Sequence, residues 1–218
     1  KISVTDYDIL RDNRRVVGLN TSRGCVRKCT FCSVPTMWKK FKQKSANRII
    51  EEIIKYHNET GVIDFYFQDS LMNGSIKVFK EFCDQLILLK SQNPQYRDIN
   101  YSGLFIVRPK AQHPEDLFRA IAESGNDHIC IGVETGSDRL RHEMDKRFTN
   151  DDLYWHLEMS SKYGIKNQLM MFCSHYKETH EDFNESLALL DRIKHYTVDQ
   201  TIMDINFATP FMLVDNTP

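Results

Sequence analysis

Residues 16–32 read VVGLNTSRGCVRKCTFC, a short β-branched run followed by a polar turn and three cysteines within eight positions. The run Val16–Leu19 is typical of a buried strand, and Cys25, Cys29 and Cys32 follow it in a C-x3-C-x2-C pattern. Cysteines placed at random at this chain's frequency would give that spacing in well under about 1% of such chains. The stretch therefore indicates a loop at the end of a strand, with three thiols that act together.

Outward from this stretch, short apolar runs alternate with longer segments of helical period, which is the pattern of βαβ units. Five more strands are predicted at 62–67, 101–107, 128–133, 165–172 and 200–207. Helix starts are predicted at Ser45, Ser75 and Pro114, and capping-box pairs at Thr149 with Asp152 and Thr179 with Asp182, the last helix running to about His195. This alternation predicts an α/β fold with a parallel sheet.

The domain organisation follows from what separates these elements. No Ser/Gly linker, charge run or low-complexity tract marks a boundary, so 16–218 is predicted to be one domain. Residues 1–15 are predicted to be a lead-in from a preceding segment, in a chain that is a fragment of a longer protein. Six parallel strands joined by right-handed crossovers form either an open doubly wound sheet or part of a (β/α) barrel. In both, chemistry is expected at the carboxyl ends of the strands.

Composition limits the class of protein. The 29 Lys and Arg nearly balance the 30 Asp and Glu, and this net charge of -1 does not indicate nucleic-acid binding. Hydrophobic residues make up 41% of the chain, which is enough for a packed core. No apolar run approaches the roughly 18 residues of a membrane span, and residues 1–24 lack a signal-peptide layout. We expect a cytoplasmic protein that makes no membrane contact.

The three clustered cysteines admit more than one interpretation. Buried structural cysteines would be in poor company, because Arg23, Arg27 and Lys28 share their loop. A structural zinc needs a fourth ligand, and no second Cys or His pair with suitable spacing follows. An iron–sulfur cluster fits three thiolates in a tight loop and leaves one iron open for a substrate or cofactor. The basic residues of the loop would offset the charge of such a cluster.

The cysteine pattern, with aromatic Phe31 before Cys32 and a place after the first strand, resembles the radical SAM superfamily. The resemblance implies a partial (β/α)6 TIM-like barrel with a 4Fe–4S cluster on Cys25, Cys29 and Cys32. It also implies that S-adenosylmethionine (SAM) chelates the open iron and is reductively cleaved to methionine and a 5'-deoxyadenosyl radical, which abstracts a substrate hydrogen. Phe31 matches the aromatic position near the adenine.

Two acidic residues at later strand ends match positions that contact SAM in this family. Asp69, in the stretch FYFQDS at 65–70, is the candidate for the methionine amino group, with a turn or helix cap as the alternative. Glu134, in IGVETGS at 131–137, is the candidate near the ribose. Its alternative is a carboxylate that accepts amide protons from the following helix, with Ser137 as the cap.

Two basic residues complete the expected SAM contacts. Lys146, in MDKRFT at 144–149, matches a family position where a cation meets the SAM carboxylate, and a surface salt bridge is the alternative. Arg108 follows the predicted strand 101–107 and points toward the same rim, where the SAM carboxylate, a substrate or Asp69 are its candidate partners.

The stretch after the fifth strand departs from the family. Relatives carry a Gly-Pro-Gly-Glu-Thr run where this chain reads CSHYKETHED at 173–182, so His175 and Tyr176 are expected to reshape the adenine side of the pocket. His175 and His180 are interpreted as surface or cap residues rather than metal ligands. The remaining cysteines, Cys83, Cys130 and Cys173, are predicted to lie in the core.

The sequence thus predicts a radical SAM enzyme core, closest in motif style to the branch that carries cobalamin-binding domains and to methylthiotransferases. Cobalamin would bind through a domain outside these 218 residues. The expected partners are SAM, a substrate of unknown identity and a reducing partner such as a flavodoxin or ferredoxin. A methylthiotransferase, a cluster-binding electron-transfer domain without SAM cleavage and a zinc-stabilised binding module remain the alternatives.

Overall fold

The computed structural model describes residues 9–11 and 14–212. Its main sheet has seven strands in the order β1-β2-β5-β6-β7-β8-β9. Strands β2, β5, β6, β7, β8 and β9 run parallel, and β1 pairs antiparallel with β2 at the edge. The strands are β1 Ile9–Arg11, β2 Arg14–Leu19, β5 Asp64–Phe67, β6 Asn100–Phe105, β7 Asn126–Glu134, β8 Asn167–Cys173 and β9 Ile202–Pro210. All six predicted strands are confirmed, and the prediction of a parallel α/β sheet with them.

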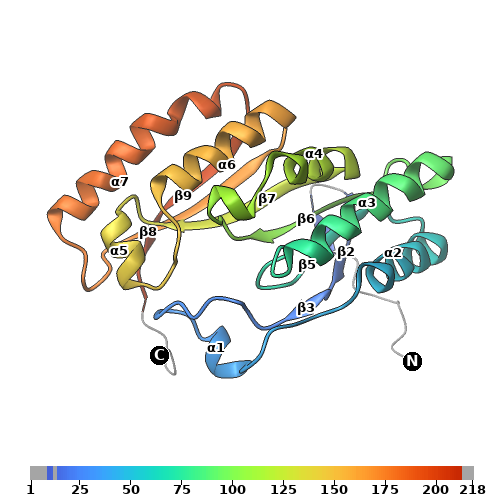
Figure 1. Ribbon diagram of the computed structural model, residues 1–218, viewed down its shortest axis with the longest axis horizontal. Helices are drawn as coiled ribbons and strands as arrows, with labels where there is room; N and C mark the ends of the chain where they lie inside the picture. The colour runs from blue at the N-terminus through green and yellow to red at the C-terminus, as the bar shows by residue number, and fades with distance from the viewer. Residues whose placement is uncertain (1–8, 12–13, 213–218) are drawn as a thin grey trace.

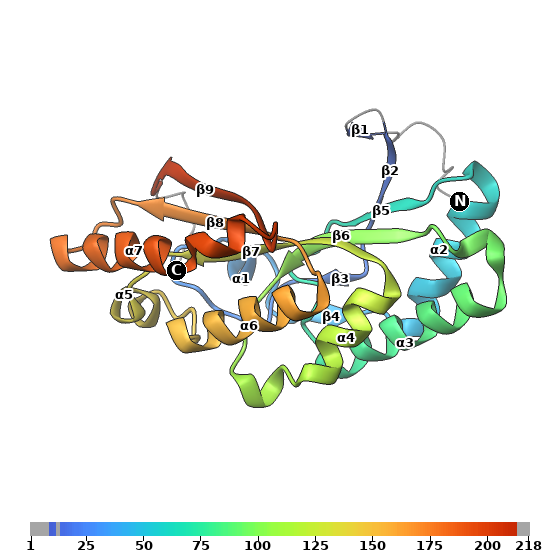
Figure 2. The same ribbon diagram turned by 90° about the horizontal axis from the view of Figure 1, so that it is seen from above.

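Helices connect successive parallel strands and lie along one face of the curved sheet, as Figures 1 and 2 show. The longer ones are α2 Ala46–Thr60, α3 Ile76–Gln92, α4 Glu115–Ser124, α6 Asn150–Tyr163 and α7 His180–Ile193. Shorter ones are α1 Val34–Met37, α5 Asp138–Glu143 and three 3-10 turns, η1 Pro94–Tyr96, η2 Lys110–Gln112 and η3 Lys194–Thr197. The segment with α1 and strand β3 (Ser22–Arg23) lies across the strands from helices α4, α6 and α7 (Figure 1).

The helix ends follow from side-chain capping. Ser45 and Ser75 accept hydrogen bonds from the backbone N–H of Arg48 and Val78, which satisfies donors left free in a first helical turn. Complete capping boxes start α6 at Thr149 and α7 at Thr179, as predicted. The predicted end of the last helix near His195 is two residues too long, since α7 ends at Ile193 and η3 continues as a 3-10 turn.

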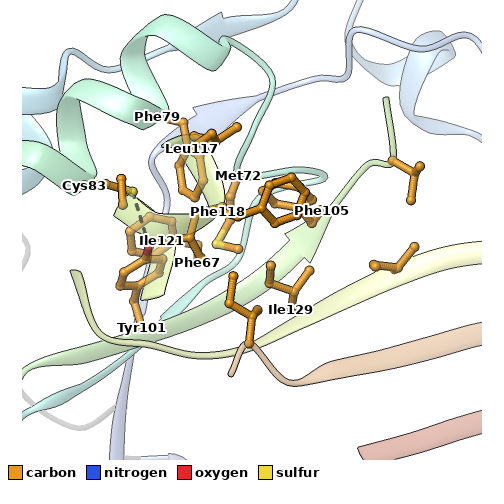
Figure 3. Close-up of a cluster of buried hydrophobic side chains, with 14 of the residues drawn as sticks. Phe67, Met72, Phe79, Cys83, Tyr101, Phe105, Leu117, Phe118, Ile121 and Ile129 are labelled. Carbon is orange, nitrogen blue, oxygen red and sulfur yellow. Dashed lines mark hydrogen bonds between the residues drawn. The ribbon is translucent and has the colours of Figure 1, made fainter. Parts of the chain in front are cut away.

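The core lies between the sheet and the helices. Aromatic rings from α3, β5 and β6 pack against one another in it, with Phe67 stacked on Tyr101 at 5.4 Å between ring centroids (Figure 3). Cys83 and Cys130 are buried as predicted, and the Cys83 thiol lies 3.4 Å from the Tyr101 hydroxyl. Cys173 is only half-buried, because it ends β8 at the open rim of the sheet.

Two expectations from the sequence, one about residues 9–11 and one about Arg108, differ from the structure. Residues 9–11 lie within the predicted lead-in, yet they form the antiparallel edge strand of the main sheet. The third strand of the parallel set ends at Phe105, so Arg108 lies in the following loop rather than at the strand end. No helix in the described ranges, 9–11 and 14–212, is long and apolar enough to cross a membrane.

Candidate active site

The loop that carries the three cysteines is closed at its base by a two-stranded ladder. β3 pairs antiparallel with β4 (Lys42–Gln43), so residues 22 and 43 face each other. One residue further out, the Lys44 N–H donates to the Thr21 carbonyl at 2.8 Å. The intervening residues 24–41, which include α1, are therefore held as one closed loop at the carboxyl end of β2.

Asp69 braces the first end of this loop. It follows β5, is 3% exposed, and accepts hydrogen bonds from the backbone N–H groups of Thr21 at 2.9 Å and Ser22 at 2.8 Å. The Thr21 hydroxyl donates to its second carboxylate oxygen. Burial raises the pKa of Asp69, and these hydrogen bonds oppose that rise. The carboxylate thus fixes the turn that leads from β2 into the cysteine loop.

The far side of the cysteine loop rests on residues 144–147. The Thr30 N–H donates to the Met144 carbonyl at 3.1 Å, and the Arg27 guanidinium reaches the Arg147 carbonyl at 3.5 Å. Asp145 and Arg147 both have a φ of 56°, in the left-handed region that L-residues rarely adopt. The two loops are therefore joined through backbone groups, and the second holds an unusual conformation where it meets the first.

The three thiols face one cavity. Cys25, Cys29 and Cys32 are free cysteines that line a cavity of about 260 Å³, with Cys29 buried and the other two half-buried. The Arg27 N–H points at the Cys25 sulfur from 3.3 Å. Burial raises the pKa of the Cys29 thiol to about 11, so this thiol is protonated at neutral pH unless a metal replaces its proton.

Glu134 and Lys146 meet inside the same cavity. Their side chains are 13% and 12% exposed, and the Lys146 Nζ lies 2.6 Å from a Glu134 carboxylate oxygen. Glu134 ends β7 with a φ of 67°, where the pairing of β7 with β8 slips between Gly132 and Glu134. A bulge of this kind turns a side chain away from the regular pleat. The alternative for Glu134, a carboxylate that accepts amide protons from the next helix, is not what the structure shows, because the carboxylate forms an ion pair inside the cavity.

Gly132 makes room for this ion pair. A Cβ built on Gly132 would lie 2.3 Å from a Glu134 carboxylate oxygen and 2.9 Å from the Lys146 Nζ. Real Cβ atoms essentially never come within 3.0 Å of another non-bonded atom, so a larger residue at this position would make the two side-chain ends shift. The expected helix cap at Ser137 is confirmed, because the Ser137 hydroxyl accepts a hydrogen bond from the Leu140 N–H at the start of α5.

The remaining wall of the cavity is largely apolar. Leu104, Phe105, Ile106 and Met170 line it from the ends of the neighbouring strands, together with Phe31. Arg27 also lines it, with a buried Nε that has no hydrogen-bond partner in the described part of the chain. Arg27 was expected only as one of the basic residues that offset the charge of a cluster, although its position two residues after Cys25 could have indicated that it lines the cavity.

The structure brings Phe31, Glu134 and Lys146 together with the three cysteines, with the Lys146 Nζ 5.8 Å from the Phe31 ring centroid. Asp69 and Arg108 do not line this cavity. The Arg108 guanidinium instead donates to the carbonyls of Asn73 and Gly74 at 3.0 and 2.9 Å. Both residues thus support loops that surround the cavity.

The unusual stretch after the fifth parallel strand packs beside Phe31. Phe31 contacts Phe172 and Phe211 edge-on, at 5.7 and 6.4 Å between centroids, and His175 lies 4.5 Å from the Phe211 ring. His175 is 4% exposed, so the expectation of a surface residue is wrong, whereas its Nδ1 does accept a hydrogen bond from the Lys177 N–H, as a local cap would. Sequence reasoning missed this aromatic cluster, because Phe211 lies beyond the last predicted strand.

The donor set fits an iron–sulfur cluster better than a single ion. Among residues 9–11 and 14–212, no three His, Cys, Asp or Glu side chains converge closely enough to hold one metal ion. A tetrahedral zinc would require such convergence, whereas a cubane cluster binds each cysteine at a different iron. The three free thiols are spread around one cavity, with basic Arg27 and Lys146 beside them, which is the arrangement that a cubane cluster requires.

Comparison with known proteins indicates the same superfamily that the cysteine pattern resembles. The sequence profile of the radical SAM superfamily matches residues 19–190. The chain therefore belongs to this superfamily, whose members are enzymes that use a 4Fe–4S cluster and SAM.

Individual relatives fall into more than one branch of the superfamily. The chain is 30% identical over 175 residues to the ribosomal protein uS12 methylthiotransferase RimO of Bacteroides thetaiotaomicron, covering 77% of this chain and 38% of that protein. It is 27% identical over 148 residues to cytidylyl-2-hydroxyethylphosphonate methyltransferase of Streptomyces wedmorensis, covering 66% and 25% respectively. The chain thus spans well under half the length of these curated relatives.

A solved structure has a fold similar to that of this chain. The radical SAM methyltransferase TsrM from Kitasatospora setae, solved with cobalamin and a 4Fe–4S cluster bound, superposes with a TM-score of 0.78 at 17% identity. The match covers 94% of this chain and 36% of that one. This likeness confirms the partial TIM-like barrel, since it spans nearly the whole described chain.

Proposed function

We propose that this chain is the catalytic core of an enzyme that cleaves SAM reductively and directs the resulting radical onto a substrate bound over the cavity. The observation that carries the proposal is the convergence of Cys25, Cys29 and Cys32 with the Glu134–Lys146 ion pair on one cavity at the carboxyl ends of the strands. When bound, a 4Fe–4S cluster on these cysteines supplies the electron that breaks the sulfonium bond of SAM.

The residues of the chain bind SAM and exclude water from the site. Lys146 offers an ammonium group for the SAM carboxylate, and Glu134 holds that ammonium group in the cavity. Phe31 offers a ring face next to the third cysteine for the adenine. The apolar wall of Leu104, Phe105, Ile106 and Met170 keeps water from the site, which protects a reactive carbon radical.

Asp69 and Arg108 enter the proposal as supporting residues. Both were predicted to contact SAM, and both engage backbone groups of loops around the cavity instead. We assign Asp69 to positioning the cysteine loop and Arg108 to positioning the 73–74 turn.

We extend the proposal to the domain organisation. Residues 16–218 would form the catalytic domain of a longer protein, and the part of the predicted lead-in that forms β1 and the start of β2 belongs to the sheet of that domain. A low-potential reductant would supply the electron. We place the enzyme in the cytoplasm, because thiolate ligands persist in a reducing compartment.

The reaction after SAM cleavage has two candidates. Methyl transfer with cobalamin held by a further domain is supported by the likeness to TsrM and to the Streptomyces methyltransferase. Methylthiolation is supported by the 30% identity to the uS12 methylthiotransferase. Transfer of a labelled methyl group from SAM to cobalamin would favour the first, and sulfur incorporation into a product the second.

The test is anaerobic reconstitution with iron and sulfide, followed by SAM and dithionite and measurement of 5'-deoxyadenosine. We expect product from the wild type and none from a Cys25→Ala, Cys29→Ala, Cys32→Ala variant. A Cys130→Ala, Cys173→Ala variant, which changes cysteines outside the cavity, is the matched control and should retain activity. A loaded cluster that leaves SAM intact would contradict the proposal and favour an electron-transfer domain.

A further inference from the structure

The nearly neutral net charge conceals a strong local asymmetry. Residues 13–50 contain ten Lys and Arg and no Asp or Glu. The other 180 residues hold 19 Lys and Arg against all 30 Asp and Glu. The only part of the chain with so large a basic excess is therefore the part that contains the cysteine loop.

Several of these basic side chains are exposed without an acidic partner, and two of them, Arg23 and Lys42, are opposite each other across β3 and β4. Lys44 and Arg48 pair with glutamates on α2, and Arg27 lines the cavity. Arg14 and Arg15 begin strand β2. The remaining five form no ion pair within the described ranges and are exposed: Arg23, Lys28, Lys39, Lys40 and Lys42. We call these five the basic face.

Apolar side chains lie among these charges. Val26, Met37 and Trp38 are 39%, 66% and 42% exposed. The Arg23 guanidinium lies 4.5 Å above the Trp38 ring, which holds the indole at the surface. Exposed apolar groups ringed by charges of one sign are typical of a protein-docking surface rather than of an ordinary solvated face.

None of the five residues of the basic face lines the cysteine cavity, and Arg23 and Lys42 line a separate hollow together with Trp38. Cys25, Arg27, Cys29 and Phe31 line the cavity, whereas the alternate residues Val26 and Lys28 are exposed. A Cβ built on Gly24 would lie 3.2 Å from the Trp38 Cβ and 3.0 Å from the Lys40 carbonyl oxygen. Trp38 and Lys40 therefore lie directly against the residue that precedes Cys25.

We propose that the basic face is the docking site of a small acidic one-electron carrier protein that reduces the cluster. The inference rests on the proposed function, since only a redox-active cluster requires such a carrier. In the transfer the carrier loses one electron and the cluster gains it, and no atom is exchanged. A carrier on this face would approach the cluster through its own ligand loop and leave the cavity free for SAM and substrate.

The geometry favours a protein carrier over a nucleic acid. A phosphate backbone would be attracted by the same lysines, but a nucleic-acid substrate has to reach the cavity with its reacting atom. The cavity is lined by Cys25 and Cys29, and no residue of the basic face lines it. An electron has no such requirement, because it passes through the loop.

The test combines binding with two ways of reducing the enzyme. The probe is an oxidised flavodoxin of strongly negative net charge, and its affinity is measured by calorimetry at low and high salt. The variants are the charge reversal Lys39→Glu, Lys40→Glu, Lys42→Glu and the milder change of the same residues to Gln. The matched control reverses three exposed lysines elsewhere, Lys77, Lys166 and Lys194.

We expect the charge reversal on the basic face to weaken flavodoxin binding at least about tenfold at low salt, the Gln variant to weaken it less, and the control to keep it. The difference should shrink as salt screens the charges. Flavodoxin-driven formation of 5'-deoxyadenosine should fall in parallel, while dithionite-driven formation stays at the wild-type level.

Equal flavodoxin affinity in the wild type and the charge reversal would overturn the inference. So would loss of binding to a single-stranded RNA oligomer with flavodoxin affinity unchanged, which would assign the face to nucleic acid. Failure of dithionite-driven SAM cleavage in the wild type is a different result, because it contradicts the proposed function and leaves the binding comparison readable.

Discussion

Asp69 is a residue whose type suggested one role and whose contacts indicate another. An Asp69→Asn variant keeps one oxygen for the Thr21 and Ser22 N–H groups, which both donate to Oδ1, but places an NH2 group against the Thr21 hydroxyl, which donates to Oδ2. Because a buried donor then loses its acceptor, we expect the free energy of unfolding to drop by about 1–3 kcal/mol and iron per chain after reconstitution to fall. SAM affinity of the loaded fraction, measured by equilibrium binding, should stay unchanged. A large loss of that affinity with full cluster loading would restore Asp69 as a SAM ligand.

Gly132 provides a second prediction at the scale of one residue. Gly132→Ala adds a methyl group where the Glu134–Lys146 ion pair lies, so the pair must shift. We expect SAM to bind about tenfold more weakly, equivalent to about 1.4 kcal/mol, while cluster absorbance stays normal. Lys146→Met should weaken binding at least as much, and Lys110→Met, which changes an exposed lysine over Trp155, should not. Unchanged SAM affinity in both site variants would exclude the ion pair from the SAM site.

At the scale of elements, the two capping boxes offer a comparison within one molecule. Within the described part of the chain, the Asp152 carboxylate in the capping box of α6 bonds only to Thr149. The Asp182 carboxylate in the capping box of α7 bonds to Thr179 and also accepts from Ser137 and Arg139. The Arg139 guanidinium beside Asp182 holds the pKa of that carboxyl well below its usual range. Asp152→Ala should cost about 1 kcal/mol of stability, the usual value of a cap. Asp182→Ala should cost about 2–3 kcal/mol, because it also leaves buried donors unpaired. Chemical unfolding of both variants measures the difference, and equal losses would show that the links to α5 add nothing.

At the scale of the whole molecule, two buried histidines make stability depend on pH. Burial lowers the pKa of His113 to about 2 and that of His156 to about 4, against about 6.5 in an unfolded chain. Below about pH 6.5 the unfolded chain takes up protons that the folded one excludes, so the free energy of unfolding falls with falling pH. Each histidine contributes a slope of up to about 1.4 kcal/mol per pH unit.

The measurement is unfolding at several pH values between 6 and 5. His113→Gln and His156→Gln should each flatten the pH dependence, whatever their effect on absolute stability. His180→Gln, at an exposed position, is the matched control and should leave it as in the wild type. A wild-type slope retained in both buried-site variants would contradict the assignment.

Much of the fold could be predicted from the sequence, because strand and helix periods are local properties. The runs at 62–67 and 128–133 and the caps at Thr149 and Thr179 all lie where the pattern placed them. The cysteine spacing likewise specified the centre of the site. The start of the sheet was less readable, since the edge strand Ile9–Arg11 is three residues long and carries no period.

The unpredicted parts of the site depend on contacts between distant segments. Glu134 reaches Lys146 because a bulge in β7 turns its side chain into the cavity, and no residue type in the sequence predicts that bulge. From the sequence alone, Asp69 could be a SAM ligand or a residue that positions a loop. Its hydrogen bond to Thr21, 48 residues away, becomes visible only in the folded structure. The basic face was hidden by a whole-chain sum, in which acidic residues elsewhere cancel it.

The backbone joint between the cysteine loop and residues 144–147 gives the enzyme reciprocity. Thr30 donates to the Met144 carbonyl, and the residue two positions later, Lys146, lines the cavity where we propose that it meets SAM. If ordering one loop orders the other, the cluster must raise the affinity for SAM, and SAM must raise the affinity for the cluster by the same factor. The iron retained at equilibrium with a chelator, compared with and without SAM, measures that factor, and equal retention would mean that the joint transmits nothing. An enzyme built this way keeps its oxygen-sensitive centre best while its cosubstrate is abundant.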